Sequence, residues 1–318
     1  MRALYLDAAG LSLCDDLPIP RPRSDEALIR VLKAGICATD LELVKGYKGF
    51  RGVLGHEFVG RVEEASDRDW IGRRVVGTIN LGCGSCRQCL GSGPEHCRQR
   101  RVVGIFGRDG AFAEYLTLPI ANLLPVADEI ADDVAVFTEP LAAALRIREQ
   151  VTISPSARLA VVGPGRLGLL IAQVLALTGS RLTVLGRRRE SLALPEELGL
   201  DTGLAADAEA DSFDLVVEST GNEAGFSEAL RLLRPGGTLV LKSTFHGAAT
   251  VDLTKLVVDE IRVVGSRCGP FEPALRLLAR GGVKVRPLID AEYPLSSGLQ
   301  AMEHAARPGV RKVLLRCY

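Results

Sequence analysis

The chain has 318 residues, of which 47% are hydrophobic, and its 39 Lys and Arg residues balance 39 Asp and Glu residues. This length predicts about two domains, and the zero net charge argues against a basic surface that would attract nucleic acid or anionic lipid. Residues 1–20 lack the pattern of a signal peptide, and no stretch approaches the ~18 uninterrupted apolar residues of a membrane span. We therefore expect a cytoplasmic protein without nucleic-acid or membrane partners.

The N-terminal part of the chain predicts β strands up to about residue 130. Short alternating runs, such as 26–37 and 56–65, are interrupted by Gly or Pro about every ten residues. From about residue 157, apolar strand-like runs alternate with helical patterns, which is typical of βαβ units, and the tail returns to short strands. We expect an α/β protein with a β-rich domain over 1–140, completed by 275–318, and a doubly wound domain over 141–274.

Two short segments in the β-rich part offer metal ligands. The first, GICATD (35–40), contains Cys37, and the second, GHE (55–57), contains His56 and Glu57. A lone Cys or His is more often structural than ligating. Together, however, these residues supply a thiolate, an imidazole and a carboxylate, the mixed set that catalytic zinc accepts while keeping one position open.

Three more residues could assist such a metal. Asp40 could accept a hydrogen bond from His56 and fix its tautomer, as carboxylates beside metal ligands do. Thr39 could pass on the proton of a zinc-bound alcohol. Glu139, at the transition between the two domains, could face the same metal.

Four cysteines fall within 15 residues, at Cys83, Cys86, Cys89 and Cys97. In a cytosolic chain this clustering favours metal binding over disulfides. Four thiolates suit a structural zinc site, and nearby glycines allow the tight turns that converge the sulfurs. An iron–sulfur cluster also uses such spacing, so the spacing alone leaves that alternative open.

A glycine-rich loop marks the start of the doubly wound domain. The strand-like run 158–162 is followed by GPGRLG (163–168), which opens a helical pattern. In this context the loop predicts a dinucleotide site in which the pyrophosphate lies at the helix N-terminus, and a mere glycine-rich turn is the alternative. The expected contacts in the loop are Gly163, Gly165, Arg166, Leu167 and Gly168.

The end of the next strand indicates which cofactor is preferred. An acidic residue there would bind the ribose 2′-hydroxyl of NAD, but this chain has Gly186, Arg187 and Arg188, and its first carboxylate is Glu190. Because guanidinium groups bind phosphate bidentately, the segment favours NADP. The alternative is that the arginines form a solvated helix start and NAD binds less selectively.

Taken in order along the chain, these motifs resemble the zinc-containing medium-chain dehydrogenase/reductase superfamily. The matching segments are GICATD, GHEFVG, the four-cysteine lobe, DGAFAEY (109–115), TEPLAAAL (138–145), GPGRLG and VVESTG (216–221). The resemblance implies a GroES-like catalytic domain, a Rossmann domain and an active site in the cleft between them. It also implies a catalytic zinc at Cys37, His56 and Glu57, a structural zinc in the lobe, and a cofactor contact at Thr220.

Within the superfamily, Glu139 resembles the pattern of polyol and threonine dehydrogenases, and Asn80 with the 186–188 segment resembles glucose dehydrogenases. The resemblance implies a zinc-dependent oxidoreductase that transfers a hydride between a secondary alcohol, polyol or sugar and NAD(P), of which the arginines favour NADP. It also implies a homo-oligomer, a dimer or tetramer that associates through Rossmann domains, and the apolar run Ile261–Val264 is our candidate for that edge. The competing interpretations are a zinc-free quinone or enoyl reductase and a non-catalytic NADP-binding redox sensor.

Overall fold

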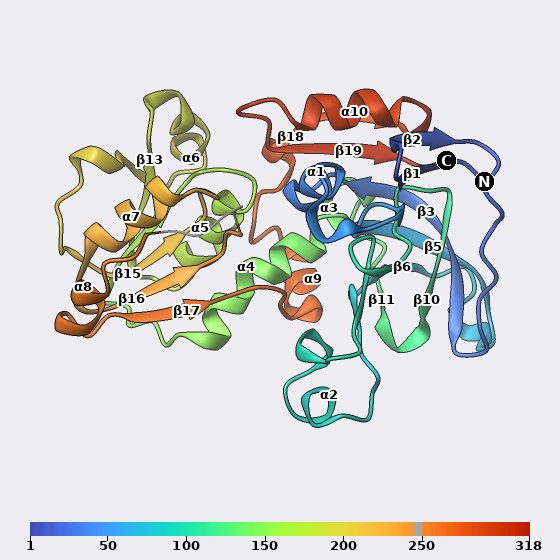
Figure 1. Ribbon diagram of the computed structural model, residues 1–318, viewed down its shortest axis with the longest axis horizontal. Coiled ribbons are helices and arrows are strands. Elements are labelled where there is room, and N and C mark those ends of the chain that lie inside the picture. The colour runs from blue at the N-terminus through green and yellow to red at the C-terminus, as the bar shows by residue number, and fades with distance from the viewer. Residues whose placement is uncertain (245–249) are drawn as a thin grey trace. The chain divides into compact units, whose positions relative to one another are not determined.

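The computed structural model describes residues 1–244 and 250–318. The chain divides into two compact units, one formed by Met1–Glu139 together with Phe271–Tyr318 and the other by Pro140–Pro270 (Figure 1). None of the helices in the described ranges is long and apolar enough to cross a membrane.

The first unit is built mainly from β strands. Its larger sheet has the order β11-β6-β5-β3-β19-β18, with β10 also pairing with β3, and two three-stranded sheets, β2-β1-β4 and β7-β8-β9, complete it. The elements are β1 (Ala3–Asp7), β2 (Gly10–Cys14), β3 (Glu26–Gly35), α1 (Ala38–Val44), β4 (Gly52–Val53), β5 (Glu57–Ala65), β6 (Arg74–Gly77), β7 (Asn80–Leu81), α2 (Arg87–Gly91), β8 (Arg101–Val103), β9 (Gly107–Arg108), β10 (Tyr115–Pro119), β11 (Leu123–Pro125), α3 (Asp132–Ala135), α9 (Phe271–Ala279), β18 (Ile289–Pro294), α10 (Gly298–Ala305) and β19 (Lys312–Arg316). Single 3-10 turns occupy Tyr47–Gly49, Arg68–Trp70, Pro94–His96, Ile120–Asn122, Arg286–Leu288 and Leu295–Ser297.

Strand β3 lies at the centre of the larger sheet. Most of its residues are buried, including Ile29 and Val31, because β5, β10 and β19 all pair with it and apolar side chains cover its faces. Its last residue, Gly35, lies opposite Glu57, the first residue of β5, and also opposite Leu314 of β19. The end of β3 therefore meets the start of β5 and the middle of β19, although these segments are far apart in the sequence.

The second unit contains a six-stranded parallel sheet of order β14-β13-β12-β15-β16-β17. Numbered along the chain, this is the order 3-2-1-4-5-6 of a Rossmann fold. Its elements are β12 (Arg158–Val162), α5 (Gly168–Ala176), β13 (Arg181–Gly186), α6 (Ala193–Glu197), β14 (Asp201–Leu204), β15 (Phe213–Glu218), α7 (Glu223–Leu232), β16 (Leu233–Leu241), α8 (Leu253–Val258) and β17 (Arg262–Gly265), with 3-10 turns at Arg189–Ser191 and Ala205–Asp207. Helix α4 (Thr138–Gln150) begins in the first unit and continues into the second.

Two details differ from the pattern expected from sequence. Short helices α1 and α2 interrupt the region predicted to be β strands, and they have only seven and five residues, too few for a helical period to be visible in the sequence. The expected boundary between 274 and 275 would cut helix α9. In the structure the second unit ends at Pro270, so the whole of α9 lies in the first unit.

Candidate active site and cofactor site

Cys37, His56 and Glu57 place a sulfur, an imidazole nitrogen and a carboxylate oxygen within 4.8 Å of one another. Cys37 follows β3 closely, and His56 directly precedes β5, so the register of these two strands brings the three side chains together. His56 and Glu57 are buried, whereas Cys37 is half-buried. The donor set fits zinc, which accepts sulfur, nitrogen and oxygen ligands in catalytic sites.

Asp40, which is fully buried, orients this group. Its Oδ2 accepts a 2.8 Å hydrogen bond from the backbone N–H of Cys37, the residue before helix α1. Its Oδ1 lies 3.2 Å from Nδ1 of His56, although the two atoms are not aligned as a hydrogen bond. Burial disfavours the imidazolium, but Asp40 and Cys37 outweigh this effect and hold the pKa of His56 well above its ordinary value. Metal binding requires the neutral ring, so the raised pKa makes metal binding depend on pH.

Lys312 supplies the positive charge that faces Glu57. Its Nζ forms a salt bridge with Oε2 of Glu57, donates a 3.4 Å hydrogen bond to the carbonyl of Ile36 and lies 5.7 Å from the centre of the Phe137 ring. Both charged side chains are almost completely buried, at 5% and 1% exposure. Gly35 makes room for this pair, because a Cβ at that position would collide with Oε2 of Glu57.

The other residues expected at the metal lie further out. Thr39 is half-buried, and its Oγ1 lies 3.8 Å from Sγ of Cys37. Glu139 is also half-buried and lies in the first turn of α4. Among the described residues, the 4.8 Å group consists of Cys37, His56 and Glu57, and Glu139 is not part of it.

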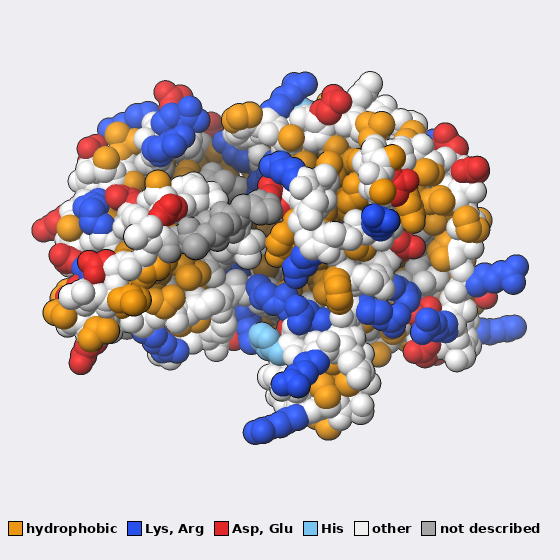
Figure 2. Space-filling model, in the orientation of Figure 1, with side chains coloured by type: hydrophobic (Ala, Val, Ile, Leu, Met, Phe, Trp, Pro, Cys, Tyr) orange, Lys and Arg blue, Asp and Glu red, His pale blue; other side chains and the backbone are white. Residues whose placement is uncertain are grey.

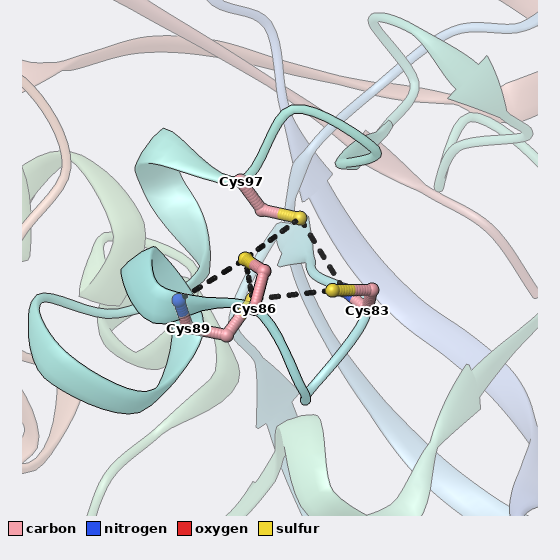
Figure 3. Close-up of side chains that lie close together, drawn as sticks. All are labelled: Cys83, Cys86, Cys89 and Cys97. Atoms are coloured by element: carbon pink, nitrogen blue, oxygen red, sulfur yellow. Dashed lines mark hydrogen bonds between the residues drawn. The ribbon is translucent and has the colours of Figure 1, made fainter.

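The four cysteines of the lobe point toward one another (Figure 3). Sγ of Cys86 lies 3.5 Å from Sγ of Cys89 and 3.8 Å from Sγ of Cys97, and Sγ of Cys83 lies 4.0 Å from Sγ of Cys89. These distances far exceed a disulfide bond, and all four residues are free cysteines. Backbone N–H donors of Ser85 and Cys86 lower the pKa of Cys83 to about 6, which favours the thiolate that metals bind.

The glycine loop between β12 and α5 has the geometry of a dinucleotide site. Gly163 has a φ of +101°, which disfavours any residue with a side chain. Gly168 packs so closely on the carbonyl of Gly163 that a Cβ would collide with it, whereas the space beside Gly165 is open to at least 4 Å. Arg166 and Leu167 are half-buried in the same turn. The loop therefore fits a pyrophosphate that approaches the backbone at Gly165.

The segment from Arg187 to Arg189 follows β13 at the same edge of the sheet. All three arginines are exposed, and the described residues contain no carboxylate that forms a salt bridge with them. Gly186 precedes them, and a Cβ there would lie 2.6 Å from Oγ of Ser191 and 2.8 Å from Cδ2 of Leu192. A side chain at position 186 would thus press on Ser191 and Leu192.

Comparison with known proteins agrees with this geometry. The model of the alcohol dehydrogenase GroES-like domain matches residues 23–128, and that of the zinc-binding dehydrogenase domain matches residues 167–280. L-galactonate-5-dehydrogenase of Escherichia coli is 30% identical over 306 residues, which cover 90% of this chain and 89% of that protein. The chain belongs to the zinc-type medium-chain dehydrogenase/reductase superfamily.

This dehydrogenase is also 31% identical to L-threonine 3-dehydrogenase of Streptomyces avermitilis, over 99% of both chains. A solved structure from Sinorhizobium meliloti, described as a zinc-binding dehydrogenase bound to NADP, is 30% identical and superposes with a TM-score of 0.90 over 99% of this chain and 98% of that one. The expected fold, a GroES-like domain with a Rossmann domain, is confirmed, and the protein is an oxidoreductase of the alcohol and polyol dehydrogenase type.

Sequence reasoning missed two buried charged residues of this dehydrogenase, Lys312 and Glu218. Lys312 opens the apolar run of β19, and Glu218 closes the apolar run of β15. The signal that could have revealed them is a charged residue at the end of an apolar run that predicts a buried strand. Charged residues are almost never fully buried unless they are paired, so such a position predicts a partner inside the protein.

Breaking the Lys312 salt bridge should destabilise the first unit. In a Cys37→Ser background, which disables the metal group, Lys312→Met leaves Glu57 buried without an opposite charge. We expect a loss of about 3–5 kcal/mol in the free energy of unfolding, measured by urea denaturation with the fluorescence of Trp70, the single tryptophan. Adding Glu57→Gln should recover most of the loss. Equal stability of Cys37→Ser with and without Lys312→Met would show that the salt bridge contributes nothing.

Proposed function

We propose that this dehydrogenase oxidises a secondary alcohol group of a polyol or sugar, with zinc bound at Cys37, His56 and Glu57 and NADP as hydride acceptor. The convergence of these three side chains within 4.8 Å carries the proposal. Zinc at this group supplies a Lewis acid that lowers the pKa of a substrate hydroxyl. The relative that acts on L-galactonate supports a small, polyhydroxylated substrate.

The chain's own residues then have separate tasks. Thr39, beside Cys37, accepts the substrate's hydroxyl proton at Oγ1 and releases its own hydroxyl proton to solvent, so that it stays neutral. Asp40 holds the backbone of Cys37 and faces Nδ1 of His56, which leaves Nε2 for the metal. Glu139, at the start of α4, is the outer acidic group that tunes the metal's surroundings.

The lobe of Cys83, Cys86, Cys89 and Cys97 has a different role in this proposal. Four sulfurs fill a tetrahedron and leave no position for a substrate, so we assign the lobe a structural zinc. A zinc-free reductase would not need the Cys37 group, and a redox sensor that uses the cysteine lobe would not need it either. Both alternatives therefore leave the Cys37 group without a purpose. The cytoplasmic location remains a prediction from the sequence.

Purified protein should contain two equivalents of zinc. Cys37→Ser should retain one equivalent, keep its fold and lose activity more than about 100-fold, because losing a ligand costs more than the 10- to 100-fold typical of residues behind the ligands. Cys83→Ser should chiefly lower the thermal midpoint, since structural zinc binding contributes to folding. Cys14→Ser, in β2 and outside both metal groups, is the control. A fully active, metal-free enzyme would refute the mechanism.

The preference for NADP follows from the three exposed arginines after β13. They carry positive charge at the carboxyl end of the strand that follows the glycine loop, where the adenosine ribose lies in Rossmann folds. Charged hydrogen bonds to a 2′-phosphate contribute about 1.5–3 kcal/mol each. That range corresponds to roughly 10- to 100-fold in affinity per contact.

Arg187→Ala combined with Arg188→Ala should lower kcat/KM for NADP about 10- to 100-fold or more and change that for NAD little. The measurement compares both cofactors on a panel of polyols and sugars. Arg181→Ala removes an exposed arginine at the opposite end of β13 and is the matched control. These substitutions test the arginines without disturbing Gly186, whose replacement would press on Leu192. A wild-type preference for NAD, or an unchanged ratio, would contradict the assignment.

We further propose that two copies associate through β17, the last strand of the parallel sheet. Its outer edge pairs with no strand of the described residues, and Val263 on it is 43% exposed. The neighbouring helix α8 exposes Leu253, Val257 and Val258 by 68–75%, and apolar side chains gather over these elements in Figure 2. An exposed edge beside an apolar surface is suited to antiparallel pairing about a two-fold axis.

Light scattering at micromolar concentration should therefore give a dimer or tetramer for the wild type. Val257→Glu with Val258→Glu should shift it toward smaller species, because burying unpaired carboxylates opposes association. Leu177→Glu replaces an exposed apolar residue after α5 and should leave the mass unchanged. A wild-type monomer would count against the proposal.

A further inference from the structure

Glu218 is a buried carboxylate at the carboxyl end of β15, with 1% of its surface exposed. Its Oε1 accepts hydrogen bonds from the backbone N–H of Thr220 at 2.6 Å, from Oγ1 of Thr220 at 2.6 Å and from the N–H of Gly221 at 3.2 Å. Its Oε2 is buried and has no hydrogen-bond partner among the described residues. The side chain thus gathers three donors from two nearby residues, Thr220 and Gly221, around one oxygen.

The hydroxyl of Thr220 is committed to this carboxylate. The hydroxyl donates its hydrogen bond to Oε1 of Glu218, and its oxygen accepts a weak 3.4 Å hydrogen bond from the N–H of Asn222. The side chain is also enclosed, since a Cβ on Gly163 would lie 2.9 Å from Cγ2 of Thr220 and a Cβ on Gly225 would collide with its Oγ1. Thr220 is therefore held in place by Glu218 on one side and by two glycines on the others.

The same segment supports the glycine loop. The backbone N–H of Ser219 donates to the carbonyl of Val162 at 3.0 Å, and Oγ of Ser219 lies 2.9 Å from the carbonyl of Gly163. Gly221 donates in addition to Oγ of Ser243 at 2.9 Å. Ser219 and Thr220 thus lie against Gly163, the first glycine of the loop, and Glu218 holds the backbone of Thr220 and Gly221.

We propose that Glu218 is a positioning residue for the dinucleotide cofactor, acting through Thr220 and Gly221 on the backbone around Gly163. The inference rests on the proposed assignment of the glycine loop to the cofactor. In this arrangement the hydroxyl of Thr220 donates its hydrogen bond to Glu218, and its methyl group packs against Gly163 of the loop. Because Oε2 has no partner among the described residues, all of these hydrogen bonds converge on Oε1, which ties Thr220 and Gly221 to one point.

The test measures the Kd of NADPH and NADH by cofactor fluorescence with the full-length protein. Glu218→Met keeps the volume but removes the acceptor, and it should raise Kd about 10- to 100-fold, as expected for the loss of hydrogen bonds to a charged group. Glu218→Gln keeps an acceptor oxygen and should recover part of the binding. Thr220→Val should weaken binding in the wild-type background and have little further effect beside Glu218→Met, because both act through one contact.

Thr178→Val is the matched control. Thr178 donates a 2.6 Å hydrogen bond to the carbonyl of Leu175 at the far end of α5, so its loss should lower the thermal midpoint and leave Kd unchanged. If Glu218→Met does not fold, Glu218→Gln carries the same cycle with Thr220→Val.

Two results would overturn the inference: a Kd within twofold of wild type for the folded Glu218 variant, or an equal effect of Thr220→Val in both backgrounds. The second result would mean that Thr220 contacts the cofactor itself. Failure of the wild type to bind either cofactor would instead overturn the proposed function.

Discussion

A carboxylate buried beside Gly35 is the constraint on which the metal group depends. Glu57 lies opposite Gly35 in the β3–β5 register and has almost no access to water, so it requires an opposite charge within the protein. Lys312 provides that charge, and the absence of a side chain at Gly35 leaves space for the carboxylate, since a Cβ there would press on Oε2 of Glu57. The positions of Cys37 and His56 follow, because each lies within two residues of this strand pair. The salt bridge between Glu57 and Lys312 and the absence of a side chain at Gly35 therefore fix where the three metal donors lie.

The second unit solves a similar problem differently. Glu218, the last residue of β15, is also buried, but its hydrogen bonds come from the chain immediately after it, from Thr220 and Gly221. In the first unit, Lys312 of β19 connects two strands that are far apart in the sequence. In the second unit, donors from Thr220 and Gly221 shape only the loop that follows β15. In both units a charged group that would be costly to bury alone is used to fix the backbone beside a proposed ligand.

The sequence was most informative where function depends on neighbouring residues. The spacing of the four lobe cysteines predicted that their sulfurs would converge, and they do. The GPGRLG motif predicted a tight turn, and Gly163 has the positive φ of such a turn. Lys312 could not be found in this way, since 255 positions separate it from Glu57 and no local pattern links them. Gly186 was interpreted as space for a phosphate, but the packing of Ser191 and Leu192 gives it a second reason. Side-chain partners across a sheet depend on register, which single-sequence patterns do not specify.

The first unit is discontinuous, and this affects the order in which it can be completed. Synthesis proceeds from the N-terminus, so Glu57 leaves the ribosome long before Lys312 exists. The second unit, Pro140–Pro270, is continuous and can close on its own while the larger sheet still lacks β18 and β19. During that interval the nascent chain holds Glu57 without its lysine. The salt bridge between Lys312 and Glu57 can therefore form only after the whole second unit has been synthesised.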